Sequence, residues 1–325
     1  MKALVYRTTS GQFQGWGPVH LQQPRGYAYA TPTHFVHVYG IADGVWVISP
    51  GLTVSMGKQG SLEDWVKQQF GAEDVESSLL DVGESIEGVW RPGIHFDKDM
   101  IAGLAQNQTD LRSAEQRLLL LIERLDELLL FIEPTPQSLG AFSQKTRELL
   151  ILACTDVEAQ WKYYLDKAGV IPTGQGFRTT DYVRLKDPLS LPDYEVSFPR
   201  HSAVVPIRPF STWSSAAPTQ SLPWYDQYNQ AKHDGLNRLS SATVLACMQA
   251  VAANLAMFSV RFGPHRLFGG QGMLSALVNS NLSVSLRDCD AKSFYPPVVD
   301  VSSRHISMTW GHANQLPPTP KPFIL

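Results

Sequence analysis

The segment 242–260, ATVLACMQAVAANLAMFSV, constrains the fold more than any other part of the chain. Its large apolar side chains recur at intervals of three and four residues, which is the period of a helix with one broad buried face. Alanines between them allow a neighbouring helix to approach closely. We therefore expect a core helix, with Gly235 and Asn237 ending the helix before it and Ser240 or Ser241 capping its start.

Length and composition indicate a folded chain without an overall attraction to polyanions. The 325 residues are 43% hydrophobic, which is enough for two domains and a large core. The formal net charge of −3 means that nucleic-acid binding would need a local basic patch. The three cysteines lack metal-ligand spacing, and the N-terminus lacks the apolar core of a signal peptide. We expect a cytoplasmic protein with reduced thiols, no membrane span, no metal site and no cofactor.

The first 100 residues are rich in glycine, valine and aromatic side chains and have little helical periodicity. The segments 34–39 and 45–48 flank the turn sequence GIADG and predict a hairpin. A short helix is predicted over 61–70, with Ser61 as its cap. His34 and His37 lie three positions apart in a strand and therefore on opposite faces, which argues against a shared metal ion.

From residue 109 the pattern becomes helical. A long amphipathic helix is predicted over 109–132, with Pro134 just beyond its end. A second helix is predicted over 143–167, with Gly169 as its C-terminal cap. The proline- and aromatic-rich segment 170–223 predicts an irregular connection that packs over the helices.

The sequence thus predicts an α+β protein. Its parts are a small β-rich N-terminal domain (1–100), a helical domain (101–290) that contains the proline-rich connection, and an extended proline-rich tail (291–325).

Polar and ionisable side chains lie directly before the core helix. On a helix, Trp224, Tyr228 and Lys232 form one strip, and Tyr225, Asn229 and His233 form the adjacent strip. One strip can pack against the core while the other presents polar groups. Glu158 lies on the apolar edge of the second predicted helix, where a carboxylate is either a paired structural acid or part of a site.

Four motifs follow one another in this chain: TRELLILACTDVEAQWKYYL (146–165), TTDYVRL (179–185), IRPFSTW (207–213) and SLPWYDQYNQAKHD (221–234). In this order they resemble a family of uncharacterised bacterial proteins with a Y-N-x-x-K-H motif. The resemblance covers roughly residues 110–265 and implies no particular activity. The family pattern continues K-H-x-R, whereas this chain has Gly235 at the arginine position and its next arginine is Arg238.

At a more distant level the helical pattern resembles the HEPN superfamily, which includes RNases of toxin and phage-defence systems. Asn229 and His233 match the motif of those nucleases, but Tyr228 stands where they carry arginine. In metal-independent RNA cleavage a cation stabilises the charge that develops on phosphate, and tyrosine supplies no such charge at neutral pH. Lys232, Arg238 or Arg261 is then the candidate replacement cation.

The resemblance implies a HEPN-like helical bundle in a bacterial defence or toxin-antitoxin type of protein that acts on RNA. If the protein is an enzyme, we expect a metal-independent endoribonuclease. Its acid/base would be His233, its orienting group Asn229, and its phosphate contact Lys232 or Arg238. The sequence leaves open whether any activity remains without the arginine.

The alternative is a non-catalytic module that dimerises and recognises a protein or a small ligand. In that case Tyr228, Asn229 and His233 form a buried hydrogen-bond cluster that ties their helix to the proline-rich connection. The expected partners are a second copy of the chain, RNA, or a protein from the same operon. A serine hydrolase or zinc enzyme is disfavoured because the sequence lacks G-x-S-x-G and H-E-x-x-H motifs.

Overall fold

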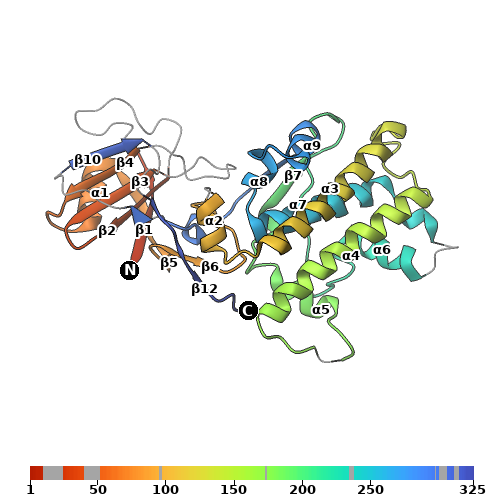
Figure 1. Cartoon of the computed structure of the whole chain (residues 1–325), viewed down its shortest axis with the longest axis horizontal. Helices are drawn as coiled ribbons and strands as arrows, with labels where there is room; N and C mark the ends of the chain where they lie inside the picture. The colour runs from red at the N-terminus through yellow and green to blue at the C-terminus, as the bar shows by residue number, and fades with distance from the viewer. Residues whose placement is uncertain are drawn as a thin grey trace. The chain divides into compact units, whose positions relative to one another are not determined.

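The computed structural model describes residues 1–9, 25–39, 52–94, 97–172, 174–233, 238–296, 298–299, 306–310 and 315–325. The chain is a mixed α+β protein, and 45% of the described residues lie in helices and 20% in strands. It divides into two compact units (Figure 1). The sheet unit comprises Met1–Gln106 and Asp288–Lys321, and the helical unit comprises Asn107–Arg287 and Pro322–Leu325.

The sheet unit is built on six antiparallel strands, because alternating apolar residues can cover both faces of such a sheet. Neighbouring strands run in the order β10 (Ile306–Trp310), β4 (Leu52–Gly57), β3 (His34–Tyr39), β2 (Arg25–Ala30), β1 (Lys2–Thr8) and β5 (Ala72–Asp81). In the register of β1 and β2, Val5 pairs with Tyr27.

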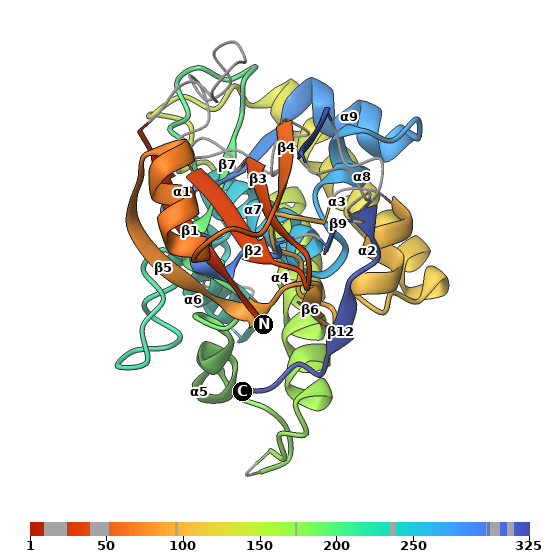
Figure 2. The same cartoon turned by 90° about the vertical axis from the view of Figure 1, so that its left-hand side faces the viewer.

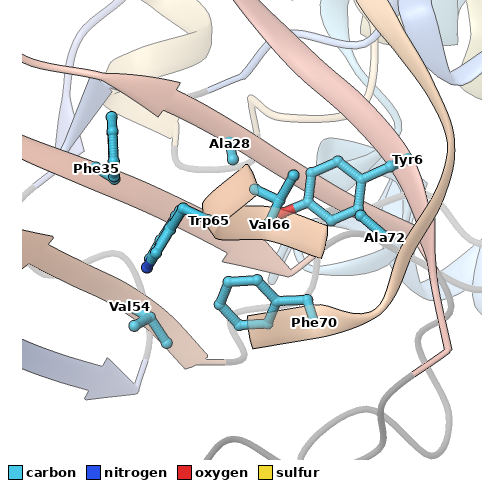
Figure 3. Close-up of a cluster of buried hydrophobic side chains, with 8 residues drawn as sticks. All are labelled: Tyr6, Ala28, Phe35, Val54, Trp65, Val66, Phe70 and Ala72. Carbon is cyan, nitrogen blue, oxygen red and sulfur yellow. The ribbon is translucent and has the colours of Figure 1, made fainter. Parts of the chain in front are cut away.

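Helix α1 (Leu62–Phe70) covers one face of this sheet (Figure 2). As predicted, Ser61 caps it, because the serine hydroxyl accepts a 3.1 Å hydrogen bond from the backbone N–H of Asp64. The helix buries Trp65, Val66 and Phe70 against the strands (Figure 3). The strand side of this cluster consists of Tyr6, Ala28, Phe35, Val54 and Ala72.

The two strand histidines lie on opposite faces, as their spacing predicted. His37 shares the face of Phe35, where its ring stacks on Phe70 at 3.7 Å between centroids and its Nδ1 hydrogen-bonds the Tyr6 hydroxyl. His34 has the parity of Val36, which belongs to the cluster on the other face. The described residues contain no group of three metal-ligating side chains.

The C-terminal segment is more regular than the expected extended tail 291–325. Strand β10 joins the edge of the main sheet beside β4, and β12 (Thr319–Lys321) pairs in parallel with β6 (Glu84–Ile86). These backbone pairings order a proline-rich segment that has no helical or alternating pattern of its own. The hairpin partner predicted over 45–48 lies outside the described residues, and β3 instead pairs with β4. The remaining elements of the unit are α2 (Asp97–Gly103), β9 (Val298–Val299), β11 (Gln315–Leu316) and a 3₁₀ turn, Ala291–Ser293.

Four helices form the core of the helical unit (Figure 1): α3 (Gln108–Phe131), α4 (Gln144–Lys167), α6 (Pro223–His233) and α7 (Val244–Phe262). Helices α4 and α7 pack on each other, and both contact α3 and α6. By length and composition, α7 is the one described helix that could cross a membrane, but 89% of its apolar window is buried within the protein. It is therefore the core helix that its sequence predicted.

The start of α7 differs from the prediction. Its cap is Thr243, whose hydroxyl accepts a 3.1 Å hydrogen bond from the backbone N–H of Ala246. Ser240 and Ser241 lie in the preceding 3₁₀ turn, Leu239–Ser241. The Ser241 hydroxyl donates a 3.1 Å hydrogen bond to the side-chain oxygen of Gln230. The capping residue must sit at the last non-helical position, and Thr243 lies two residues after Ser241 and three after Ser240.

The rest of the helical unit connects and covers these helices. Helix α4 begins one residue later than predicted, because Ser143 is its N-cap and forms a reciprocal capping box. The C-cap is Ala168, and Gly169, the predicted cap, follows it with φ of +70°. Within 170–223, the chain forms short elements and inserts aromatic rings around Trp161. The short elements of the unit are α5 (Thr179–Tyr182), 3₁₀ turns at Val183–Leu185 and Leu191–Asp193, β7 (Tyr194–Ser197) paired with β8 (Ser283–Leu286), α8 (His265–Phe268) and α9 (Met273–Asn281).

Candidate functional site

Helices α4 and α6 bring four polar side chains into one hydrogen-bonded chain, which we call the tyrosine–glutamate cluster: Glu158, Tyr225, Tyr228 and Lys232. The Tyr225 hydroxyl donates to Oε1 of Glu158 at 2.5 Å, and the Tyr228 hydroxyl donates to Oε2 at 3.4 Å. The Lys232 ammonium donates to the Tyr228 hydroxyl at 2.8 Å. The hydrogen bonds thus run from Tyr225 through Glu158 and Tyr228 to Lys232.

The spacing on α6 explains this arrangement. Tyr225, Tyr228 and Lys232 stand at i, i+3 and i+7, so all three project from the same side of the helix toward α4. Two further contacts fix the helix: the Trp224 indole N–H donates to the carbonyl of Pro209 at 2.9 Å, and Arg147 Nε donates to the carbonyl of Ala231 at 3.1 Å. The cluster is therefore held at both ends of α6.

Solvent exposure differs between the members of the cluster. Tyr228 is 0% exposed and Tyr225 is 4% exposed, whereas Glu158 is half-buried and Lys232 is exposed. The Lys232 ammonium also lies 5.0 Å from the centre of the Tyr228 ring. Lys232 is consequently the one member of the cluster that presents its charge to solvent.

Both tyrosines of the cluster and Lys232 have a raised pKa, so these three groups stay protonated at neutral pH. Burial raises the pKa of Tyr225, and its hydrogen bond to Glu158 raises it further. Burial also raises the pKa of Tyr228, although the ammonium of Lys232 opposes this shift. The hydrogen bond to Tyr228 raises the pKa of Lys232. Neither phenol is therefore ready to act as a base near pH 7.

An aromatic cluster surrounds the Tyr225 side of the site. The ring of Trp161 lies 5.4 Å from Tyr225, 5.2 Å from Tyr182 and 4.8 Å from Trp213, measured between centroids. Burial and the nearby charge of Glu158 raise the pKa of Tyr182 to about 12. Such packing fixes the rings in one arrangement. It makes the buried end of the site part of the core of the helical unit.

The neighbouring thiol does not supply a nucleophile. Cys154 lies one turn before Glu158 on α4 and is completely buried. Burial, with the negative charge of Glu158, raises the pKa of the Cys154 thiol well above its usual value. A reactive cysteine requires the opposite shift and solvent access.

The structure brings together three of the six site residues named from the sequence: Glu158, Tyr228 and Lys232. Asn229 is half-buried on α6, and its side chain makes no hydrogen bond to a described residue. Arg238 is exposed at the start of the 3₁₀ turn before α7 and makes no ion pair with a described residue. His233 is the last residue of α6, and its side chain lies outside the described part of the structure.

One suggested replacement cation is already committed elsewhere. Arg261, near the end of α7, is 9% exposed and contacts the Asp110 carboxylate at 2.8 Å. Its guanidinium also lies 3.6 Å from the centre of the Tyr163 ring. Arg261 therefore ties α7 to α3 and α4, and Lys232 is the cation that the cluster itself contains.

Sequence reasoning placed Tyr225 on the strip of Asn229 and His233 and so missed its role. The signal was present in the i, i+3 spacing of Tyr225 and Tyr228, which also puts two side chains on one helix face. Comparisons of the chain with protein-family models, curated proteins and solved structures gave no match. The interpretation of the site therefore rests on its geometry and on the motif spacing.

Proposed function

We propose that the helical unit is HEPN-like and carries a degenerate nuclease motif. In this proposal the protein belongs to a bacterial defence or toxin type of system and binds RNA with, at most, weak metal-independent RNase activity. Support comes from the N-x-x-K-H spacing at the end of α6 and from the packing of α4 and α7 on each other and on both α3 and α6. One helical arrangement can serve several activities, so the proposed activity is argued from the side chains of the site.

The burial of Tyr228 carries the proposal. This side chain occupies the position of the nuclease arginine, is 0% exposed, and engages Glu158 and Lys232 with its hydroxyl. A buried neutral phenol cannot contact a phosphate or stabilise its developing charge. Loss of one such electrostatic group costs a factor of about 10² to 10³ in rate. Exposed Lys232 remains as a phosphate contact, which favours binding over cleavage.

Binding and cleavage of a fluorescently labelled RNA by the purified chain, in buffer containing EDTA, test the proposal. We expect measurable binding that Lys232→Ala weakens, together with little or no cleavage. Lys162→Ala is the matched control, since Lys162 is exposed on α4 and paired with Asp166. Rapid cleavage that His233→Ala abolishes would show an intact nuclease. Absence of RNA binding would reject the RNA-directed proposal.

The second candidate function is a non-catalytic module that dimerises and binds a protein or small ligand. It is favoured by the tyrosine–glutamate cluster, which links α6 to α4 through Glu158, whereas the cluster expected from the sequence used Asn229 and His233 and tied the helix to the proline-rich connection. Light scattering of the purified chain tests the dimer. A monomer that also binds RNA through Lys232 would exclude this candidate in favour of the first.

A further inference from the structure

A groove in the helical unit lies away from the tyrosine–glutamate cluster. It is lined by residues of α3, of α8 and of the glycine-rich loop that leads into α9. Figure 1 shows where these elements lie in the helical unit. Its volume is about 390 Å³, whereas a hollow between α3 and α4 measures about 30 Å³. Sites for small molecules have volumes of about 300 to 1,000 Å³. The groove is therefore large enough for a ligand of mononucleotide size.

Two arginines and one glutamate provide the charge of this groove: Arg112 and Glu115 from α3, and Arg266 from α8. Arg112 is exposed and makes no ion pair with a described residue. The Arg266 side chain is 28% exposed, and its Nη1 lies 3.8 Å from the Glu115 carboxylate. Arg112 is therefore the guanidinium of the groove whose charge no described carboxylate neutralises. A guanidinium presents paired N–H donors that match the oxygens of a phosphate.

Uncharged donors line the same groove. Gln116 and Gln271 are exposed and carry amide N–H groups. Ser275 is 2% exposed, and its hydroxyl oxygen accepts a 3.4 Å hydrogen bond from Asn279. The hydroxyl hydrogen of Ser275 is not used in a hydrogen bond to a described residue, so it remains for a ligand oxygen. These groups suit an anion with several oxygens better than an apolar ligand.

Glycine at two positions shapes the groove differently. A Cβ at Gly270 would lie 3.0 Å from the Arg266 carbonyl oxygen and 3.3 Å from Cβ of Ser275, so the loop packs tightly there. A Cβ at Gly272 would meet nothing within 4 Å, and the φ of this residue is −87°. Side chains are thus tolerated at 272 by the fold, but they reduce the space in the groove.

We propose that this groove binds a ligand that carries a phosphate monoester and is about the size of a mononucleotide. The inference does not depend on the proposed function of the α6 motif, because none of the groove residues belongs to the tyrosine–glutamate cluster. The phosphate would lie between the guanidinium groups of Arg112 and Arg266, with the rest of the ligand along the loop 270–272. The monoester could belong to a free nucleotide or to the 5′ end of an RNA.

Titration calorimetry of the full chain with AMP, adenosine and hexaribonucleotides with and without a 5′-phosphate tests this proposal. We expect AMP or the phosphorylated RNA to bind, and its counterpart without phosphate to bind at least about tenfold more weakly, because charge-assisted hydrogen bonds are lost. Preference for AMP over the phosphorylated RNA identifies a free nucleotide, and the reverse preference identifies an RNA end. Equal binding with and without phosphate, or no binding of any probe, overturns the proposal.

Substitutions of groove residues test whether the ligand binds in this groove. Arg112→Gln should weaken binding about tenfold, and Glu115→Gln should strengthen it, since one removes a positive charge and the other a negative charge. Gly272→Thr should weaken binding without lowering the melting temperature, because threonine is about as good an N-cap of α9 as glycine. Arg124→Gln is the control, because Arg124 is an exposed arginine of the same helix that faces a different hollow. An equal effect of Arg124→Gln, or no effect of Arg112→Gln and Gly272→Thr, would contradict the assignment. His233→Ala should leave this binding unchanged, which separates it from the α6 motif.

Discussion

The Tyr225 hydroxyl donates a 2.5 Å hydrogen bond to Glu158 and thereby joins α6 to α4 at the edge of an aromatic core. The donor is 4% exposed and the acceptor is half-buried, so water compensates only partly if the bond is lost. The same carboxylate accepts a second, longer bond from Tyr228. Glu158 is thus one of the points at which α6 is attached to the core, beside the contacts of Trp224 with Pro209 and of Arg147 with Ala231.

Removal of the Tyr225 hydroxyl should destabilise the helical unit. Tyr225→Phe deletes the donor but keeps the ring, and we expect a loss of about 1 to 2 kcal/mol in the free energy of unfolding. Urea denaturation measures the change. Tyr163→Phe is the control, because Tyr163 lies on α4 and its hydroxyl makes no hydrogen bond to a described residue. Equal losses in the two variants would show that the Tyr225–Glu158 bond contributes nothing.

The buried tyrosines should make the protein sensitive to alkali. Burial raises the pKa of Tyr225 and Tyr228, and it raises that of Tyr182 to about 12, against an ordinary value of 10.0. The folded state keeps these protons while the unfolded state loses them, so their contribution is complete below pH 10 and is lost as the pH rises above it. We expect the free energy of unfolding, measured by near-UV circular dichroism, to fall more steeply with pH above pH 10. Tyr225→Phe should reduce the steepness; an unchanged pH profile would contradict the assignment.

The buried amide of Asn254 should not tolerate a negative charge. Asn254 is 1% exposed, its Nδ2 donates to the carbonyls of Ala153 and Ala250 at 2.9 Å each, and its Oδ1 accepts from Gln160. Asn254→Asp would place an acceptor against two carbonyl oxygens, at a cost of about 3 kcal/mol or more at pH 7. The cost should shrink as the pH falls, because burial favours the protonated acid. Asn279→Asp, at an exposed position, is the control in thermal unfolding.

The three cysteines should differ in reactivity. Burial raises the pKa of the Cys154 thiol well above its usual range and that of Cys247 to about 12, whereas Cys289 is half-buried. A thiol reagent added to the native protein should therefore label Cys289 first, and the other two only after unfolding. Mass spectrometry of the labelled peptides identifies the sites. Rapid native labelling of Cys154 would show that the core between α4 and α7 opens readily.

Long periodic segments were predictable from the sequence because the packing of one face of a helix imposes its spacing on the chain. Helices α3, α4 and α7 lie within a few residues of their predicted bounds. The pairing of β10 with β4 was not predictable, since strand partners some 250 residues apart leave no local signal. The same holds for the link between Tyr225 and Glu158, because the sequence does not show which face of α6 turns toward α4.

In the proposed function, Tyr228 is a structural member of the tyrosine–glutamate cluster and does not contact RNA. The most direct measurement compares Tyr228→Phe with the native chain, in both urea denaturation and RNA cleavage in EDTA. We predict a loss of about 1 to 2 kcal/mol in stability, because the bonds to Glu158 and Lys232 are removed, with RNA cleavage no different from that of the native chain. Unchanged stability together with a marked fall in RNA cleavage would contradict the account, because the hydroxyl would then act in the chemistry.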